Sequence, residues 1–98
     1  MADERLSQIV LYYGNLDELN SRGSDKYEFA NELSFTSSTM DEVNPIHTNA
    51  AVEHRAKEEL MKKGYDGLVN RKTFTETRFD YGRWYIEGTP VIKKRISL

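Results

Sequence analysis

Residues 49–70 read NAAVEHRAKEELMKKGYDGLVN, and this stretch decides the fold. Its apolar side chains recur at every fourth position: Val52, Ala56 and Leu60. That spacing is the narrow apolar stripe of an amphipathic helix. Thr48 or Asn49 can cap the start of this helix, and Gly64 can supply the left-handed residue that ends it. The pattern therefore predicts one main helix over about residues 49–63, with strand-like residues directly after it.

Strand-like segments lie on both sides of this helix. A β-branched and aromatic run, Gln8–Tyr13, is typical of a buried strand. Residues 26–36 alternate between apolar and polar side chains, which predicts a strand with one buried face. After the helix, a long strand over residues 68–79 leads to a turn at Asp80-Tyr81-Gly82, and residues 83–87 return as a strand that continues extended from Thr89 to Ile96.

Irregular positions interrupt these segments. Leu16–Gly23 is polar and contains a turn signal, and residues 37–48 form the longest irregular stretch. Gly88 indicates a bulge or bend in the last strand. Pro90 lacks an N–H group, so it indicates the start of a strand, an edge or a bulge.

Together these segments predict an α+β fold, a two-layer domain of β-α-β-β type with a mostly antiparallel sheet. The main helix, at about residues 49–63, covers one face of that sheet. No linker and no repeat divides the chain, so we expect a single domain over residues 1–98.

The composition favours a folded protein in a reducing compartment. Apolar residues make up 38% of the 98 residues and the net charge is only −2, whereas disordered chains combine low hydrophobicity with high net charge. The absence of cysteine favours a reducing, cytoplasmic setting. The longest apolar run, Ile9–Tyr13, is far shorter than the roughly 20 residues of a membrane span. We therefore expect neither a membrane partner nor a secretory leader.

Charge is divided unequally between the two halves of the chain. Residues 1–53 hold three basic and ten acidic residues, a balance of −7, whereas residues 54–98 hold eleven basic and six acidic residues, a balance of +5. Opposed halves can attract each other within one fold, or attract another copy of the chain.

The second half of the chain resembles the YbjQ-like family, whose members are described as heavy-metal-binding domains. The resemblance rests on the Ala-rich helix that ends in Gly64-Tyr65-Asp66-Gly67-Leu68-Val69-Asn70, on the closing run Gly88-Thr89-Pro90-Val91, and on the early strand Ile9–Tyr13 before Gly14. It implies a β-α-β-β subunit, similar to that of dodecin, in a ring-like homo-oligomer. The chain departs from the family pattern in residues 27–35 and 37–48, and it has no cysteine for a metal.

Metal binding is one hypothesis for the site. His54 and Glu58 are four residues apart on the outer face of the predicted helix, and His47 in the preceding loop is a third candidate ligand. Imidazole and carboxylate ligands of this kind bind Zn²⁺ or Ni²⁺. Because a site needs three or four ligands, a solvated helix face is the stronger interpretation.

Enzymatic chemistry has little support in the sequence. The chain lacks a cysteine nucleophile, a Gly-x-Ser-x-Gly elbow, a His-Glu-x-x-His motif and a phosphate loop. No residue pattern indicates a cofactor. A non-enzymatic role is therefore the favoured interpretation, and the sequence leaves enzymatic activity open as the alternative.

Single-stranded nucleic acid is a second possible partner. Basic and aromatic side chains alternate along the C-terminal strands, and the candidates for the contact are Arg71, Lys72, Arg83 and Trp84. Aromatic rings beside cations are how strands hold unpaired bases. The pI near 5.7 argues against this interpretation, because nucleic-acid-binding domains are usually basic.

Self-assembly is the interpretation that the sequence favours. Eleven per cent of the residues are aromatic, which is a large share for so thin a core. Aromatic side chains are enriched in subunit interfaces. The candidates beside the hairpin turn are Tyr81, Trp84 and Tyr85. We therefore predict a homo-oligomer larger than a dimer, with room for a small ligand or a metal between subunits.

Overall fold

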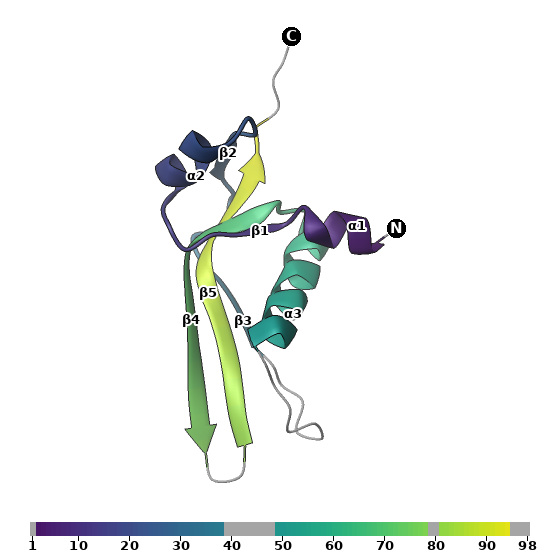
Figure 1. The fold of residues 1–98 in the computed structure, drawn as a ribbon, viewed down its shortest axis with the longest axis vertical. Coiled ribbons are helices and arrows are strands. Elements are labelled where there is room, and N and C mark those ends of the chain that lie inside the picture. The colour runs from purple at the N-terminus through teal and green to yellow at the C-terminus, as the bar shows by residue number, and fades with distance from the viewer. Residues whose placement is uncertain (1, 39–48, 79–80, 95–98) are drawn as a thin grey trace.

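The computed structural model describes residues 2–38, 49–78 and 81–94 (Figure 1). Its elements, in chain order, are α1 (Ala2–Ser7), β1 (Val10–Leu11), α2 (Leu16–Arg22), β2 (Tyr27–Phe29), β3 (Phe35–Ser38), α3 (Asn49–Lys62), β4 (Gly67–Arg78) and β5 (Tyr81–Lys93). One main helix and a five-stranded sheet confirm the predicted α+β class.

The sheet is mostly antiparallel, as predicted. Its order is β1-β4-β5-β2, and β3 also pairs with β5 further along that strand. Only β1 and β4 run parallel, and the helix α3 lies in the connection between them. Helix α3 packs against one face of the sheet, and α2 lies over one end of the structure, away from α3 (Figure 1). The elements β1, α3, β4 and β5 thus follow the β-α-β-β order, with α2, β2 and β3 inserted after β1.

The main helix forms where the apolar stripe predicts it. Val52, Ala56 and Leu60 are fully buried in the larger hydrophobic cluster, against Leu68 and Ile86. The helix ends at Lys62, and Gly64 follows with a φ of 81°, the left-handed conformation that glycine adopts without a steric penalty. The stripe is therefore the part of the helix that the sheet covers.

The predicted strand over residues 26–36 is wrong in one respect, because the structure divides it into β2 and β3. The division follows from Pro90 in the neighbouring strand β5. The Ala30 N–H donates to the Pro90 carbonyl over 3.0 Å, but Pro90 has no N–H to donate in return. The β2 ladder ends at Phe29, and pairing with β5 resumes where Phe35 lies opposite Gly88.

The bulge predicted near Gly88 lies on the facing strand. The register of β4 against β5 shifts between Val69 and Lys72, so Asn70 and Arg71 together oppose Gly88. Asn70 has a φ of 54°, a left-handed conformation that asparagine tolerates better than most residues. A Cβ atom on Gly88 would lie 2.7 Å from both the Val69 carbonyl oxygen and the Leu68 Cγ. Gly88 therefore allows the two strands to approach closely opposite the bulge.

The N-terminal third contains two helices that the sequence analysis did not predict. The strand expected over Gln8–Tyr13 is reduced to Val10–Leu11, and α1 precedes it. Leu16–Arg22, expected as a polar turn, is the helix α2, whose first turn is capped by the Asn15 side chain accepting from the Glu18 N–H at 2.8 Å. Leu16 and Leu19 of this helix pack on a second cluster formed by Tyr27, Val69 and Val91. Tertiary contacts thus stabilise a helix too short to persist alone.

Other predicted segments reach the limits of the described residues. Ser37 and Ser38 belong to β3, and the remainder of the irregular stretch 37–48 lies outside the described residues. Tyr81 and Gly82, expected in the turn, already belong to β5, while residues 79–80 lie outside. The last strand is described to Lys93, and its expected end at Ile96 lies outside as well.

Candidate functional site

The long hairpin of β4 and β5 extends past the N-terminal end of α3 (Figure 1). The two strands pair from Gly67 opposite Val91 to Arg78 opposite Tyr81. Successive residues of a strand point to opposite faces, so the hairpin presents two different surfaces. Ile86 is fully buried on the face that α3 covers. We use the name hairpin face for the opposite surface, defined by the register pairs Phe74–Tyr85 and Lys72–Glu87.

An aromatic pair marks the hairpin face. Phe74 and Tyr85 are cross-strand neighbours whose ring centroids are 5.0 Å apart with an interplanar angle of 11°. This separation is typical of offset stacking. Phe74 nevertheless remains 44% exposed. The pair is thus an apolar surface that the described part of the chain leaves open to solvent.

The structure places two of the three residues predicted for the subunit contact, Trp84 and Tyr85, on opposite faces of the sheet. Tyr85 lies on the hairpin face, stacked on Phe74. Trp84, the adjacent residue, is partly buried and packs against the larger hydrophobic cluster on the opposite face. The side chain of Tyr81 lies outside the described residues. Phe74, which the sequence analysis did not select, was detectable as the residue that register places opposite Tyr85.

Among the described residues, one edge of β4 is paired only near its start. The Tyr12 N–H donates to the Leu68 carbonyl, and the N–H groups of Asn70 and Arg71 donate to the carbonyls of Gly14 and Tyr12 at 2.8 and 3.0 Å. Beyond Arg71, no described strand pairs with this edge, which continues to Arg78. Exposed edges of this length are templates for pairing with another strand.

Arg71 does not lie with Lys72 on the hairpin face. The bulge at Asn70 turns the Arg71 side chain toward α3, where its Nη2 lies 2.7 Å from the Glu53 Oε1. The guanidinium also lies 4.5 Å from the Tyr13 ring centroid, and the side chain is only 4% exposed. Glu53 and Tyr13 thus hold this arginine inside the fold. Of the residues predicted to contact nucleic acid, Lys72 is exposed, Trp84 is partly buried and the Arg83 side chain lies outside the described residues.

The predicted metal ligands are only partly brought together. The His54 Nε2 lies 2.9 Å from the Glu58 Oε1 on the exposed face of α3. His47 lies outside the described residues. Among the residues described, no group of three histidine, aspartate or glutamate side chains could hold a metal ion. The observed contact is that of an exposed helix pair.

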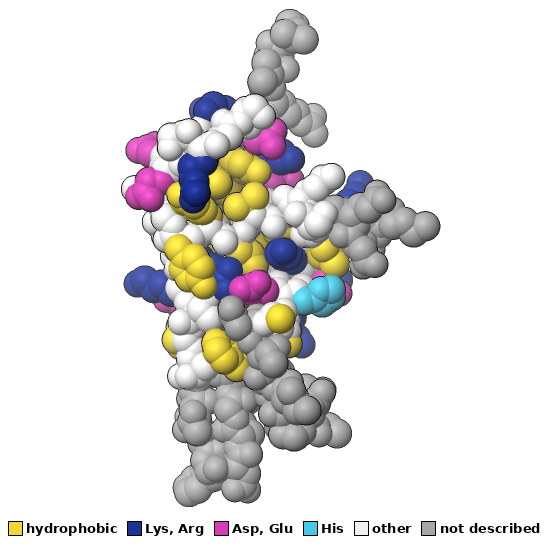
Figure 2. Space-filling view, in the orientation of Figure 1, with side chains coloured by type: hydrophobic (Ala, Val, Ile, Leu, Met, Phe, Trp, Pro, Cys, Tyr) yellow, Lys and Arg dark blue, Asp and Glu magenta, His cyan; other side chains and the backbone are white. Residues whose placement is uncertain are grey.

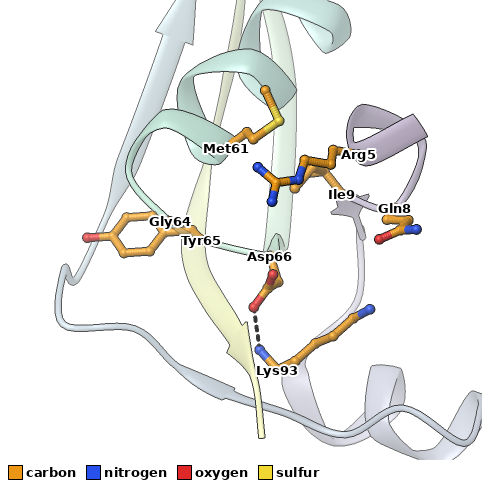
Figure 3. A pocket seen from close by; sticks show the side chains of 8 residues that line it. All are labelled: Arg5, Gln8, Ile9, Met61, Gly64, Tyr65, Asp66 and Lys93. Carbon is orange, nitrogen blue, oxygen red and sulfur yellow. Dashed lines mark hydrogen bonds between the residues drawn. The ribbon is translucent and has the colours of Figure 1, made fainter. Parts of the chain in front are cut away.

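A pocket of about 280 Å³ lies where α1, the end of α3 and the strands β4 and β5 meet (Figure 3). Its lining combines both signs of charge with apolar and aromatic groups: Arg5, Gln8, Ile9, Met61, Gly64, Tyr65, Asp66 and Lys93. The Asp66 Oδ2 accepts from the Lys93 backbone N–H at 2.7 Å, which ties the start of β4 to the end of β5. The Asp66 carboxylate therefore has a structural role in this pocket.

Perturbed pKa values occur beside this pocket, at the segment between β2 and β3. The Lys63 Nζ donates to the Glu32 carboxylate at 3.2 Å, and this hydrogen bond, with one from Tyr65, lowers the pKa of Glu32. Burial, followed by the hydrogen bond to Glu32, raises the pKa of Tyr65. The three side chains fasten this segment to the C-terminal end of α3, and this contact is the cause of the lowered pKa of Glu32.

Charges of both signs are interspersed over the view in Figure 2, among scattered hydrophobic side chains. This view shows no extended basic region of the kind that nucleic-acid-binding surfaces usually present. Within the described residues, no helix is long and apolar enough to cross a membrane.

No family model, curated protein or solved structure matches this chain. The resemblance to the YbjQ-like family therefore stays a prediction.

Proposed function

We propose that this protein is a self-assembling domain that forms a ring-like homo-oligomer, with the hairpin face in the contact between copies. The observation that carries the proposal is the Phe74–Tyr85 stack, which is aromatic, ordered by strand pairing and still half open to water. Burying such a ring pair against a second copy removes apolar area from water, at about 25 cal/mol per Å². Aromatic side chains of this kind are enriched at the centres of subunit interfaces.

Two further features support a second copy as the partner. The acidic first half and the basic second half of the chain, −7 and +5, provide attraction between copies. A β-α-β-β subunit is also what the resemblance to a ring-forming family implies.

The solution mass tests this proposal. Light scattering at micromolar concentration is expected to show a homo-oligomer larger than a dimer, against a chain mass of 11.4 kDa. Phe74→Ser and Tyr85→Ser should lower the mass, because they remove the aromatic anchor of the contact. Phe29→Ser is the matched control, since Phe29 is also exposed, at 56%, but lies on β2. A wild-type monomer, or equal loss of assembly in the Phe29 variant, would contradict the proposal.

Trp84→Ala is also expected to lower the mass, but only through the fold, because Trp84 packs on the face that α3 covers and not on the hairpin face. Trp84 contacts the larger hydrophobic cluster, so its removal also weakens the fold. Its urea melt must therefore be measured beside its mass. Phe74→Ser, which removes an exposed side chain, should leave the monomer's unfolding free energy within about 0.5 kcal/mol of wild type.

Binding of single-stranded nucleic acid is the second candidate, because Lys72 lies on the same face as the aromatic pair. Aromatic rings beside a cation can stack bases and contact phosphate. Fluorescence anisotropy with a labelled single-stranded oligonucleotide distinguishes the candidates. Nucleic-acid binding would replace assembly as the function of this face if three results came together. The wild-type protein would be a monomer, its affinity for the oligonucleotide would fall as the salt concentration rises, and both Phe74→Ser and Lys72→Glu would lower that affinity.

A further inference from the structure

The pocket where α1, the C-terminal end of α3 and the strands β4 and β5 meet can hold a small molecule (Figure 3). Its volume of about 280 Å³ is close to the lower limit of ligand pockets, which enclose roughly 300–1,000 Å³. We infer that this pocket binds a small organic anion, a molecule with one carboxylate or phosphate group and a short apolar part. This inference goes beyond the proposed self-assembly and does not depend on it.

The pocket brings together two cations from opposite ends of the chain. Arg5 belongs to α1, and Lys93 is the last residue of β5. In Figure 3 the Arg5 guanidinium points toward the pocket from one side, and the Lys93 side chain extends along another side. Asp66 is the acidic residue of the described lining. Two positive charges against one negative charge leave an excess of positive charge, which attracts an anion.

Both cationic side chains are available to a ligand. Within the described part of the chain, the Arg5 side chain makes no hydrogen bond or ion pair. The Lys93 Nζ lies 3.9 Å from the Asp25 Oδ2, and such a long pair between exposed side chains contributes little to stability. The Asp66 Oδ2, by contrast, already accepts from the Lys93 backbone N–H at 2.7 Å. A bound anion would thus meet two weakly partnered cations and a carboxylate that the backbone already engages.

The fold holds the backbone of both cationic residues in place. Arg5 precedes the buried Leu6, and the Arg5 carbonyl accepts from the Gln8 N–H at 3.1 Å. The hydrogen bond to Asp66 fixes the Lys93 backbone. Binding would order two side chains and no backbone, which keeps its entropic cost low. The Arg5 guanidinium can donate two parallel hydrogen bonds to a carboxylate or phosphate, and the Lys93 ammonium adds a point charge.

An apolar side of the pocket favours an organic anion over a bare inorganic ion. Ile9 is buried in the larger hydrophobic cluster, and Met61 packs against that cluster. Both residues line the pocket together with the two cations. A short alkyl chain can lie against them, because the flexible Met61 thioether adapts to its shape. Each methylene buried there should strengthen binding by up to roughly fourfold.

Titration with matched small molecules tests the inference. Butyrate and butyl phosphate carry the anionic group, and butanol carries the same alkyl chain without a charge. In amide NMR spectra at least one of the two anions should shift the backbone signals of Gln8, Asp66 and Lys93 to saturation, whereas butanol should not. The anion that binds more tightly identifies carboxylate or phosphate as the preferred group. No saturable shift with either anion, or equal shifts with butanol, would overturn the inference.

The alkyl chain is tested separately, with acetate and inorganic phosphate as the counterparts that carry the anionic group alone. Each should bind more weakly than its butyl counterpart, because neither can reach the apolar side that Ile9 and Met61 form. Equal affinities would overturn the assignment of an organic ligand.

Substitution of the two cations tests where the anion binds. Arg5→Gln and Lys93→Gln should each raise the dissociation constant roughly tenfold, because each removes a hydrogen bond from a charged donor. Arg5→Lys, which keeps the charge, should raise it less. Lys94→Gln is the matched control, since Lys94 is the exposed neighbour of Lys93 and does not line this pocket. Equal weakening by Lys93→Gln and Lys94→Gln would overturn the site, because general surface charge would then explain the binding.

Two further measurements keep the outcome unambiguous. Thermal melts of the Arg5 and Lys93 variants should match wild type, which separates lost binding from lost folding. Light scattering distinguishes this inference from the proposed function. A monomer that binds butyrate or butyl phosphate would remove self-assembly and support the pocket, whereas an oligomer that binds neither anion would leave self-assembly standing and overturn the pocket.

Discussion

The two faces of the sheet formed by β4 and β5 differ in what covers them: α3 covers one face, and the hairpin face is partly exposed. Ile86 is fully buried under α3, together with Leu60 and Leu68. Its neighbour Tyr85 points the other way, onto Phe74, which is 44% exposed. Consecutive residues of β5 thus belong to surfaces with separate roles. In so small a domain, one face of a sheet can thus supply the buried core while an aromatic ring on the other stays partly exposed.

The bulge at Asn70 lies at the boundary between these two regions. It shifts the alternation of β4 by one residue, which brings Arg71 under α3 and leaves Lys72 on the hairpin face. Without this shift the two residues would exchange faces. A single left-handed asparagine therefore determines which of two adjacent cations is buried with Glu53 and which stays exposed.

The largest effect is expected from a substitution in the hydrophobic core between α3 and the sheet. Leu60→Ala should lower the free energy of unfolding by about 2–4 kcal/mol, because Leu60 is fully buried and its removal leaves a cavity in the core. Urea melts measure this loss. Leu33→Ala is the control of the same chemistry, since Leu33 is 91% exposed. A loss under half a kcal/mol for Leu60→Ala would contradict the buried stripe.

A smaller effect on stability is expected at Gly88, where β5 passes opposite the bulge in β4. Gly88→Ala should cost about 1–3 kcal/mol, because the new Cβ meets the Val69 carbonyl oxygen at 2.7 Å, a backbone atom that cannot move alone. Gly23→Ala serves as its comparison, since a Cβ there meets no atom within 4 Å. Equal unfolding free energies for the two variants would show that the strands do not approach closely opposite the bulge.

The smallest effect is expected from pH, at the contact between Glu32 and Lys63. Because folding lowers the pKa of Glu32 below its ordinary value of 4.5, the contact stabilises the protein above that value and ceases to do so as the pH falls through the folded pKa. Wild type should therefore be slightly more stable than Glu32→Gln near neutral pH, and the difference should vanish in acid. Thermal melts of both proteins across this range measure it, and a difference that grows in acid would reverse the sign of the argument.

Several features followed from local pattern alone. The helix at residues 49–62, its end at Gly64 and the two long strands after it depend on apolar spacing and on a left-handed glycine, both of which are local properties of the chain. The proximity of His54 and Glu58 also follows from helical spacing, without any tertiary contact.

The other features of the fold and of the site were decided by tertiary structure, because each depends on what its segment packs against. Leu16–Arg22 is helical because Leu16 and Leu19 pack against Val69 and Val91. These two valines are distant in the sequence, so no local pattern indicates the contact. The alternation of residues 26–36 predicts one strand, but Pro90, some sixty residues away, cannot continue its ladder. The same holds for the site: tertiary contacts buried Arg71 against Glu53 and paired Phe74 with Tyr85. Side-chain type is a property of the sequence, whereas burial and register come from the partner strand and helix.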